Sequence, residues 1–147
     1  MPEKETVERA RRDAREGKSP STQAGEFVRE EIEHVREGKH GVRSTKQAIA
    51  IGLSKARRAG VKLAAPKKGR VSARTRKQAT RDLRKGARKA KPSSSRSRAA
   101  SRALKDEPHS GASPKALARH AKQAARARSK RARSQSAKRA ARTRRGR

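Results

Sequence analysis

The chain has 147 residues, of which 45 are Lys or Arg and 13 are Asp or Glu, so its formal net charge is +32. Residues 1–63 hold 15 basic and 10 acidic side chains, whereas residues 64–147 hold 30 basic side chains and only Asp82, Asp106 and Glu107. We do not expect so much unbalanced charge to form a self-contained globular domain, and it calls for a polyanionic partner, with nucleic acid considered first and acidic lipid second.

The apolar side chains divide at the same point. Of the 16 Leu, Ile, Val, Phe and Met residues, 12 lie in residues 1–63, which we expect to form one small domain. Residues 64–147 have too few to form a core, and we expect them to be largely disordered. The absence of cysteine excludes disulfides and thiolate metal sites. Because no segment looks like a secretory signal or a membrane span, we expect a cytoplasmic protein.

Residues 1–63 are predicted to form a head of three helices, at about 3–16, 20–37 and 45–59. Three glycines suit the left-handed residue that ends a helix, namely Gly17, Gly38 and Gly60. At the helix starts, Ser19 before Pro20 suits an N-cap with proline at the first helical position, and Ser44 with Gln47 fits a capping box. The predicted fold class is all-α.

Phe27 is the only aromatic residue of the chain and is predicted to be the centre of the head's core. It lies on an apolar stripe of the second helix, which is predicted to face the third helix. Gly52 in the third helix would let the two helices approach closely. The first helix has only a narrow apolar stripe, so we expect it to be the least firmly docked.

The run REGKHGVRSTKQAIAIGLSKARRAGV, from Arg36 to Val61, resembles a family of short, strongly basic bacterial proteins. That family is catalogued as a domain of unknown function and is often labelled DNA-binding or histone-like. Segments 103–105 and 115–119 are also similar to it. The resemblance implies a bacterial origin, and it supplies no mechanism and no site residues.

Residues 64–147 are predicted to be a basic tail whose Ala/Arg/Lys segments are joined by linkers. The linkers are placed at about 64–71, 92–98 and 106–113, and the segments at about 72–90, 97–105 and 114–145. Ser72 and Ser113 are candidate helix caps. Because the residue types favour helix and the charges repel one another, we expect a tail that becomes helical on nucleic acid, like the linker-histone tails that its composition resembles.

The leading functional hypothesis is a histone-like, nucleoid-associated protein whose basic tail binds duplex DNA without sequence preference, through phosphate contacts. Duplex is favoured because no aromatic residue follows Phe27 to stack on unpaired bases. The predicted nucleic-acid-binding residues are basic: Arg43, Lys46, Lys55, Arg57, Arg58, Lys62, Lys67, Lys68, Arg70, Arg74, Arg76, Lys77, Arg81, Arg84, Lys85, Arg88, Lys89, Lys91, Arg119, Lys122, Arg126, Arg128, Lys130, Arg131, Arg133, Lys138, Arg139, Arg142, Arg144 and Arg145.

Several alternatives remain open. An RNA-binding or ribosome-associated protein would use the same counterion release. The head could instead be a helix-turn-helix whose third helix reads bases. It could also be a module for self-association or for a protein partner, where the acidic residues Glu26, Glu30, Glu31, Glu33 and Glu37 recruit or mask a basic partner. The basic segments lack the bulky apolar face of a membrane-bound helix, so no membrane partner is expected.

Two local patterns are better explained without a ligand. Gly17-Lys18-Ser19 lacks the upstream glycine of a phosphate-binding loop, because Arg12 stands in its place. His34, Glu37 and His40 are close in sequence, but as a pair of histidines across a helix end they are predicted to be surface residues, and no metal is assigned. No nucleophile and base occur together near a plausible pocket, so no enzyme, small-molecule substrate or cofactor is expected.

Overall fold

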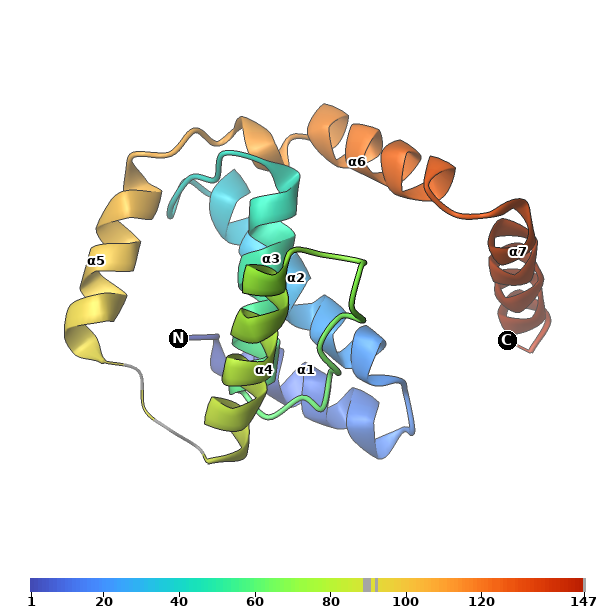
Figure 1. The fold of residues 1–147 in the computed structure, drawn as a ribbon, viewed down its shortest axis with the longest axis horizontal. Helices are drawn as coiled ribbons and strands as arrows, with labels where there is room; N and C mark the ends of the chain where they lie inside the picture. The colour runs from blue at the N-terminus through green and yellow to red at the C-terminus, as the bar shows by residue number, and fades with distance from the viewer. Residues whose placement is uncertain (89–90, 92, 147) are drawn as a thin grey trace.

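A computed structural model describes residues 1–88, 91 and 93–146 (Figure 1). The described residues form seven α-helices and one 3-10 turn: α1 (Lys4–Arg15), α2 (Pro20–Arg36), α3 (Thr45–Arg58), α4 (Ala73–Ala87), α5 (Ser94–Lys105), η1 (Ser110–Ala112), α6 (Pro114–Arg126) and α7 (Lys130–Arg145). Apart from one isolated bridge between Lys68 and Val71, no β-structure occurs among them. The predicted all-α class is confirmed.

The first three helices begin and end close to the predicted positions. The Ser19 side chain accepts a hydrogen bond from Thr22 N, and the Ser44 side chain accepts one from Gln47 N. The Gln47 side chain in turn accepts from Arg43 N at 2.8 Å, one residue before the usual partner in a capping box. Gly17, Gly38 and Gly60 all have positive φ angles, as a left-handed helix end requires.

The head's core joins all three helices. Phe27 is fully buried in a cluster with Ala10 of α1, Ala24 of α2, Ala56 of α3 and Val61. α1 also buries Thr6 and Asp13, but it packs mainly against α2, whereas α2 and α3 each pack against at least two helices, so α1 is the least extensively packed of the three, as expected. At Gly52 a Cβ atom would lie 2.6 Å from the Cα of Val28, so the predicted close approach of the two helices occurs.

α4 is the first departure from the predicted three-helix head, because it packs against α3. Its buried residues are Ala79, Asp82 and Gly86, which lie on one helix face. A Cβ atom at Gly86 would lie 2.0 Å from the carbonyl oxygen of Arg57, so only glycine permits this approach. The head is completed by a helix from the basic part of the chain.

The segment 104–112 is the second departure. It was predicted to be largely a linker, but it lies against the loop between α2 and α3. Gly41 N donates to Leu104 O and Val42 N donates to Pro108 O, each at 2.8 Å, while Thr45 Oγ1 donates to Gly111 O at 2.6 Å. Gly111 and Ala112 are buried, and Ala112 joins Val35, Val42 and Ala48 in a second apolar cluster.

The expected disorder of residues 64–147 is also wrong for the described residues, because α4 to α7 are regular helices. Serine side chains cap three of them, through Ser72, Ser113 and Ser129. The predicted linker at 92–98 is mostly helix, since α5 begins at Ser94. These segments are rich in Ala, Arg and Lys, which favour helix. The serine caps fix where the helices begin, although few of their residues pack against the core.

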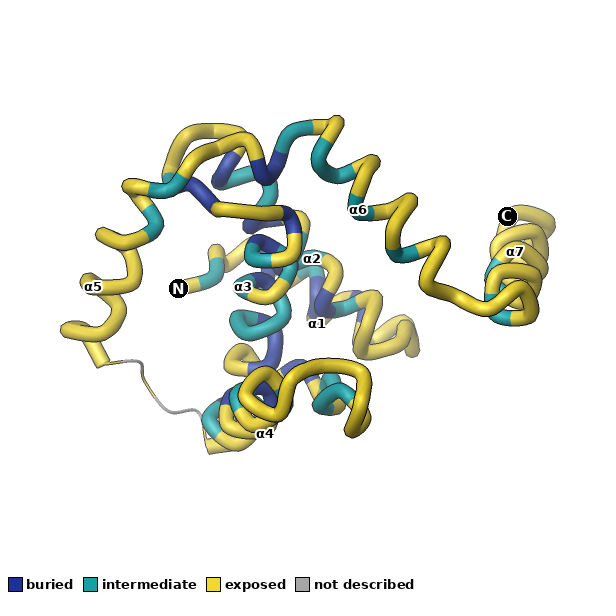
Figure 2. Tube along the Cα trace, turned by 45° about the horizontal axis from the view of Figure 1, so that its top comes forward, coloured by how far each residue is buried: buried dark blue, intermediate teal, exposed yellow. Residues whose placement is uncertain are grey.

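α5 and α7 contain no buried residue, and neither does α6. Figure 1 shows α5 standing on one side of the head, with α6 and α7 reaching away on the other side. In Figure 2 the buried positions gather in α1 to α4 and around η1, whereas α5 and α7 are exposed almost throughout. No helix in the described part of the chain is both long enough and apolar enough to cross a membrane.

Candidate nucleic-acid interface

The ion pairs divide the basic side chains into two groups. Among the described residues, every ion pair takes its basic member from residues 9–58. Two of the three acidic residues beyond 63 pair with arginines of the head, since Asp82 contacts Arg58 and Glu107 contacts Arg43. The described Lys and Arg side chains beyond residue 63 therefore have no carboxylate partner in the structure, and their charge faces solvent.

α4 fixes part of this charge in a straight row. Arg74, Lys77, Arg81, Arg84 and Arg88 follow one another at intervals of three and four residues, which places them on one side of the helix. Four of these five residues lie within α4, and Arg88 is its C-cap. All five are exposed. We call this set the α4 basic row.

The α4 basic row lies on the side of the helix opposite its buried face. The buried Ala79, Asp82 and Gly86 hold that face against α3, so the row has a fixed direction relative to the head. At 1.5 Å per residue, Arg74 and Arg84 are about 15 Å apart along the axis. Four of its five side chains are guanidinium groups, which suit bidentate contacts with phosphate.

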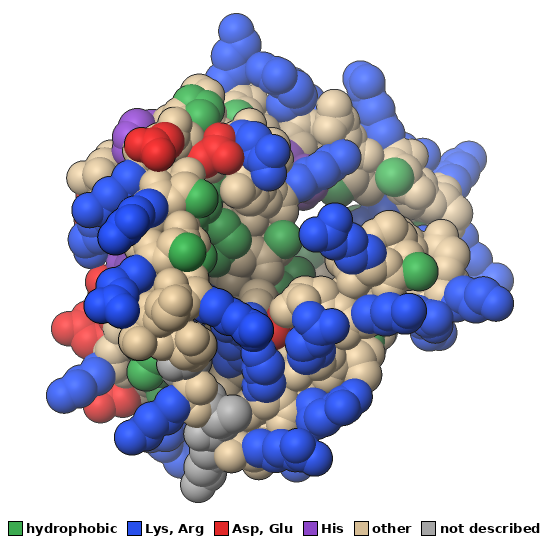
Figure 3. Space-filling model, turned by 60° about the vertical axis from the view of Figure 1, so that its left-hand side comes forward, with side chains coloured by type: hydrophobic (Ala, Val, Ile, Leu, Met, Phe, Trp, Pro, Cys, Tyr) green, Lys and Arg blue, Asp and Glu red, His purple; other side chains and the backbone are tan. Residues whose placement is uncertain are grey.

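The remaining predicted residues of the tail are solvent-facing as well. Those described as exposed are Lys67, Lys68, Arg70, Lys91, Arg119, Lys122, Arg126, Arg128, Lys130, Arg131, Arg133, Lys138, Arg139, Arg142, Arg144 and Arg145. Arg76 and Lys85 are half-buried, and Lys89 lies outside the described residues. Figure 3 shows Lys and Arg side chains spread over the face that it presents, with few acidic groups between them.

Two predicted residues of α3 have internal partners instead. Lys55 Nζ lies 2.7 Å from Glu31 Oε2 and 3.2 Å from Glu30 Oε1. Arg57 is only 7% exposed and donates to the carbonyl oxygens of Leu63 and Ala64. Burial lowers the pKa of Arg57 from its ordinary value and outweighs the opposite effect of the Asp82 charge. Lys55 and Arg57 thus stabilise the head, and they do not face a ligand.

The other predicted residues of the head are exposed. Arg43 pairs with Glu107 at 3.2 Å but keeps a side chain that is 74% exposed. Lys46, Arg58 and Lys62 are also exposed, although Arg58 donates from Nε to Asp82. Arg43 precedes α3, Lys46 lies in its first turn, Arg58 ends it, and Lys62 lies in the loop that follows.

α3 lies between α2 and α4 and packs against both. A recognition helix needs an exposed face that enters the major groove. Here α4 covers the face near the C-terminal end of α3, and Lys55 and Arg57 of α3 contact internal partners. This arrangement disfavours the helix-turn-helix alternative. It also weakens the acidic-module alternative, because Glu30 and Glu31 are buried beneath Lys55.

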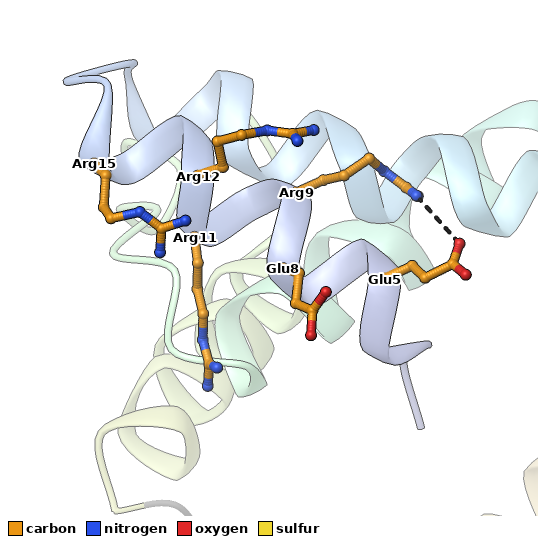
Figure 4. A pocket seen from close by; sticks show the side chains of 6 residues that line it. All are labelled: Glu5, Glu8, Arg9, Arg11, Arg12 and Arg15. Carbon is orange, nitrogen blue, oxygen red and sulfur yellow. Dashed lines mark ion pairs between the residues drawn. The ribbon is translucent and has the colours of Figure 1, made fainter.

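A second basic surface, on α1, was not predicted. A shallow hollow there is lined by four arginines and two glutamates: Glu5, Glu8, Arg9, Arg11, Arg12 and Arg15 (Figure 4). Arg9 pairs with Glu5 and Glu26, whereas Arg11, Arg12 and Arg15 are exposed and have no ion pair among the described residues. The helical spacing of Arg12 and Arg15 could have indicated this surface from the sequence, but the nearly balanced net charge of the head drew attention away from it.

Comparison with known proteins finds a family model that matches the head only. Residues 3–69 match a family of unknown function, DUF6496. The match includes α1, α2, α3 and the loop after them, and it ends before α4. No curated protein and no solved structure is detectably similar to the chain. The chain therefore contains a helical domain of unknown function, followed by helices that the family match does not cover.

Proposed function

We propose that this protein binds duplex DNA without sequence preference, as a histone-like, nucleoid-associated protein. The observation that supports the proposal is the division of the ion pairs. The carboxylates pair with basic groups of residues 9–58, and the basic side chains of α4 to α7 are left to neutralise an external polyanion.

The shape of the basic surface supports phosphate contacts over base readout. The unpaired charges lie on several helices that point in different directions, and α5 and α7 extend from the head (Figure 1). Such an arrangement suits a protein that contacts more than one segment of duplex. The single aromatic residue, Phe27, is fully buried, so stacking on unpaired bases through Phe, Tyr or Trp is not available.

RNA is the second candidate. The same charges would release counterions from structured RNA, and the geometry of the helices does not distinguish the two polyanions. The proposed preference is therefore for double-stranded over single-stranded nucleic acid, and it does not distinguish DNA from RNA.

Fluorescence anisotropy of the full chain with labelled duplex DNA, duplex RNA and single-stranded DNA, over a range of salt concentrations, tests the proposal. If about ten phosphates are contacted, the logarithm of the affinity should fall with the logarithm of the salt concentration with a slope of about −9 on duplex DNA. Scrambling the duplex sequence should leave the affinity unchanged. A slope near zero, or binding that requires one sequence, would refute non-specific phosphate binding, and tighter binding to duplex RNA at matched salt would favour the RNA candidate.

A further inference from the structure

One carboxylate and two imidazoles meet at the C-terminal end of α2, separate from the basic surfaces. Glu31 and His34 lie one turn apart on α2, and His40 follows the left-handed turn at Gly38. Each of the three residues offers one ligand atom, and these atoms lie within 4.8 Å of one another. The Glu31 side chain is fully buried, and the side chains of His34 and His40 are 13% and 15% exposed.

Glu31 lacks the hydrogen bonds that a buried carboxylate normally has. Neither of its oxygens accepts one. Lys55 Nζ lies 2.7 Å from Oε2, and His40 Nε2 lies 3.2 Å from Oε1, but neither contact has the geometry of a hydrogen bond. A buried, ionised group without hydrogen bonds is costly, so Oε1 is suited to a further cationic partner.

The orientation of His40 points to the nature of that partner. Its Nδ1 atom lies 3.1 Å from the carbonyl oxygen of Gly41, and because a carbonyl oxygen only accepts, this contact needs a proton on Nδ1. In the tautomer with its proton on Nδ1, Nε2 offers a lone pair to a metal ion that lies beside Glu31 Oε1. Two ligands of a tetrahedral zinc ion, each about 2.0–2.2 Å from the metal, lie roughly 3.4 Å apart, close to the 3.2 Å observed between Nε2 and Oε1.

The second histidine has an outer partner of the kind that metal ligands use. His34 Nε2 lies 2.8 Å from Oε1 of Glu3, which orients the ring. Ligating histidines usually make such a contact to a carboxylate or a backbone carbonyl, and here His34 contacts the former and His40 the latter. The sequence pattern pointed to Glu37, but Glu37 is exposed and pairs with Lys39, while Glu31 takes its place in the cluster.

We propose that Glu31, His34 and His40 bind one Zn²⁺ ion, with water as the fourth ligand. Two nitrogens and one oxygen are a donor set typical of zinc, whereas Ca²⁺ and Mg²⁺ need more oxygen ligands. Lys55 occupies the other oxygen of Glu31, so the carboxylate binds through Oε1 alone. The ion would tie α2 to the loop before α3, and Glu3 would link the start of the chain to the same point. This inference does not rest on the proposed binding of DNA.

The test uses the full chain, freed of metal with a chelator and titrated with Co²⁺ as a spectroscopic probe and then with Zn²⁺. One equivalent of Co²⁺ should give the visible absorption of a four-coordinate ion, and Zn²⁺ should displace it. Side-chain ¹H–¹⁵N spectra of the unmodified protein should show Zn²⁺-dependent shifts for His34 and His40. His109, which contacts the carbonyl of Val35, and His120 on α6 should not shift.

Variants provide the second readout. His34→Gln and His40→Gln should each weaken Zn²⁺ binding by more than the roughly 10–100-fold that loss of an outer-shell partner costs. His120→Gln, the matched control, should bind as the original chain does. Zn²⁺ should also raise the melting temperature of the original chain by about 5 °C and leave that of His40→Gln unchanged. The proposal is overturned if the unmodified chain binds no Zn²⁺, or if the spectra place Zn²⁺ on His109 or His120, an outcome that needs no folded variant.

Discussion

The Nε atom of Arg58 lies 2.8 Å from Oδ1 of Asp82, and this contact joins α3 to α4, the helix with the ordered basic row. Ser54 donates to Oδ2 at 2.7 Å, and Gln78 donates to Oδ1 at 3.0 Å. Burial is the largest single influence on this carboxyl and raises its pKa, but the three hydrogen bonds together outweigh it and hold the pKa below the ordinary value. Asp82 therefore fixes a basic helix in place.

Asp82→Asn should lower the free energy of unfolding by about 1–3 kcal/mol at neutral pH, because the charge that accepts from Arg58 and Ser54 is lost inside the protein. Urea unfolding followed by circular dichroism measures the change. Asp106→Asn is the control, since Asp106 is exposed and has no ion pair among the described residues. Its effect should stay within about 0.5 kcal/mol. Equal losses in the two variants would contradict an anchoring role for Asp82.

The same pair of proteins gives a pH dependence with a definite sign. Because the folded pKa of Asp82 lies below the ordinary value of 3.8, the ionised carboxylate contributes stability at and above that pH. This contribution declines as the pH falls from 3.8 through the folded pKa. The difference in unfolding free energy between the original chain and Asp82→Asn should therefore shrink in that window, and a difference that grew on acidification would show that the pKa is raised instead.

Lys55 and Lys46 lie on the same helix but should respond differently to the same substitution. Lys55→Gln removes the cation that contacts the buried Glu30 and Glu31, so the free energy of unfolding should fall by about 3–5 kcal/mol. Lys46→Gln, on the exposed side, should change it by less than about 0.5 kcal/mol. Thermal melting of the two variants in parallel decides the matter. Similar melting temperatures would place Lys55 among the surface charges, as the sequence pattern had indicated.

The helix ends of the head were predictable because their causes are local. Ser19 and Ser44 cap within three residues, and Gly38 ends α2 by its own backbone angle. The burial of Phe27 was also predictable, since no other residue could fill the core. The helix ends depend on residues that are close together in the sequence, so the sequence alone is enough to predict them.

The docking of α4 depends on contacts between distant residues and uses few apolar atoms. Ala79, Asp82 and Gly86 lie at helical spacing, but this pattern does not stand out among so many alanines and arginines. The rule that a chain with few large apolar residues remains unfolded assumes that burial needs such residues. Here a carboxylate with three donors takes their place, together with Gly86, where an added Cβ would lie 2.0 Å from the carbonyl oxygen of Arg57.

The candidate interface was predictable as a composition but not as a surface. The sequence shows that the tail is rich in basic residues, but it does not separate these from Lys55, Arg57 and Arg58 of α3, which have internal partners. Which cations pair internally depends on where Glu30, Glu31 and Asp82 lie in space. The α4 basic row is visible in the sequence only once α4 is known to be a helix with its other face buried.

Removing the charges of the α4 basic row should reduce binding to nucleic acid without unfolding the protein. The joint substitution Arg74→Gln, Lys77→Gln, Arg81→Gln and Arg84→Gln removes four exposed cations that have no ion pair among the described residues. If each contacts a phosphate, the slope of log affinity against log salt on duplex DNA should become less negative by about 3.6. Anisotropy titrations over a range of salt concentrations measure the slope.

The matched control for the α4 basic row keeps the positive charge and replaces the guanidinium group of arginine with the ammonium group of lysine. Arg74→Lys, Arg81→Lys and Arg84→Lys together should preserve the salt slope, because counterion release depends on charge. The affinity should fall only modestly, since lysine lacks the bidentate geometry of arginine. If the glutamine and lysine variants showed the same slope as the original chain, α4 would not contact phosphate.

Gly52 and Gly25 are both glycines within helices, and the structure predicts opposite effects for the same substitution. At Gly52 of α3 an added Cβ would lie 2.6 Å from Val28 Cα, so Gly52→Ala should force α2 and α3 apart and destabilise the head by about 1–3 kcal/mol. At Gly25 of α2 nothing lies within 4 Å, and Gly25→Ala should stabilise by about 0.5–1 kcal/mol through helix propensity alone. Urea unfolding of both variants of the full chain measures the difference, with Gly25→Ala as the internal standard for propensity. A stabilising Gly52→Ala would mean that the two helices are farther apart than the contact between Gly52 and Val28 requires.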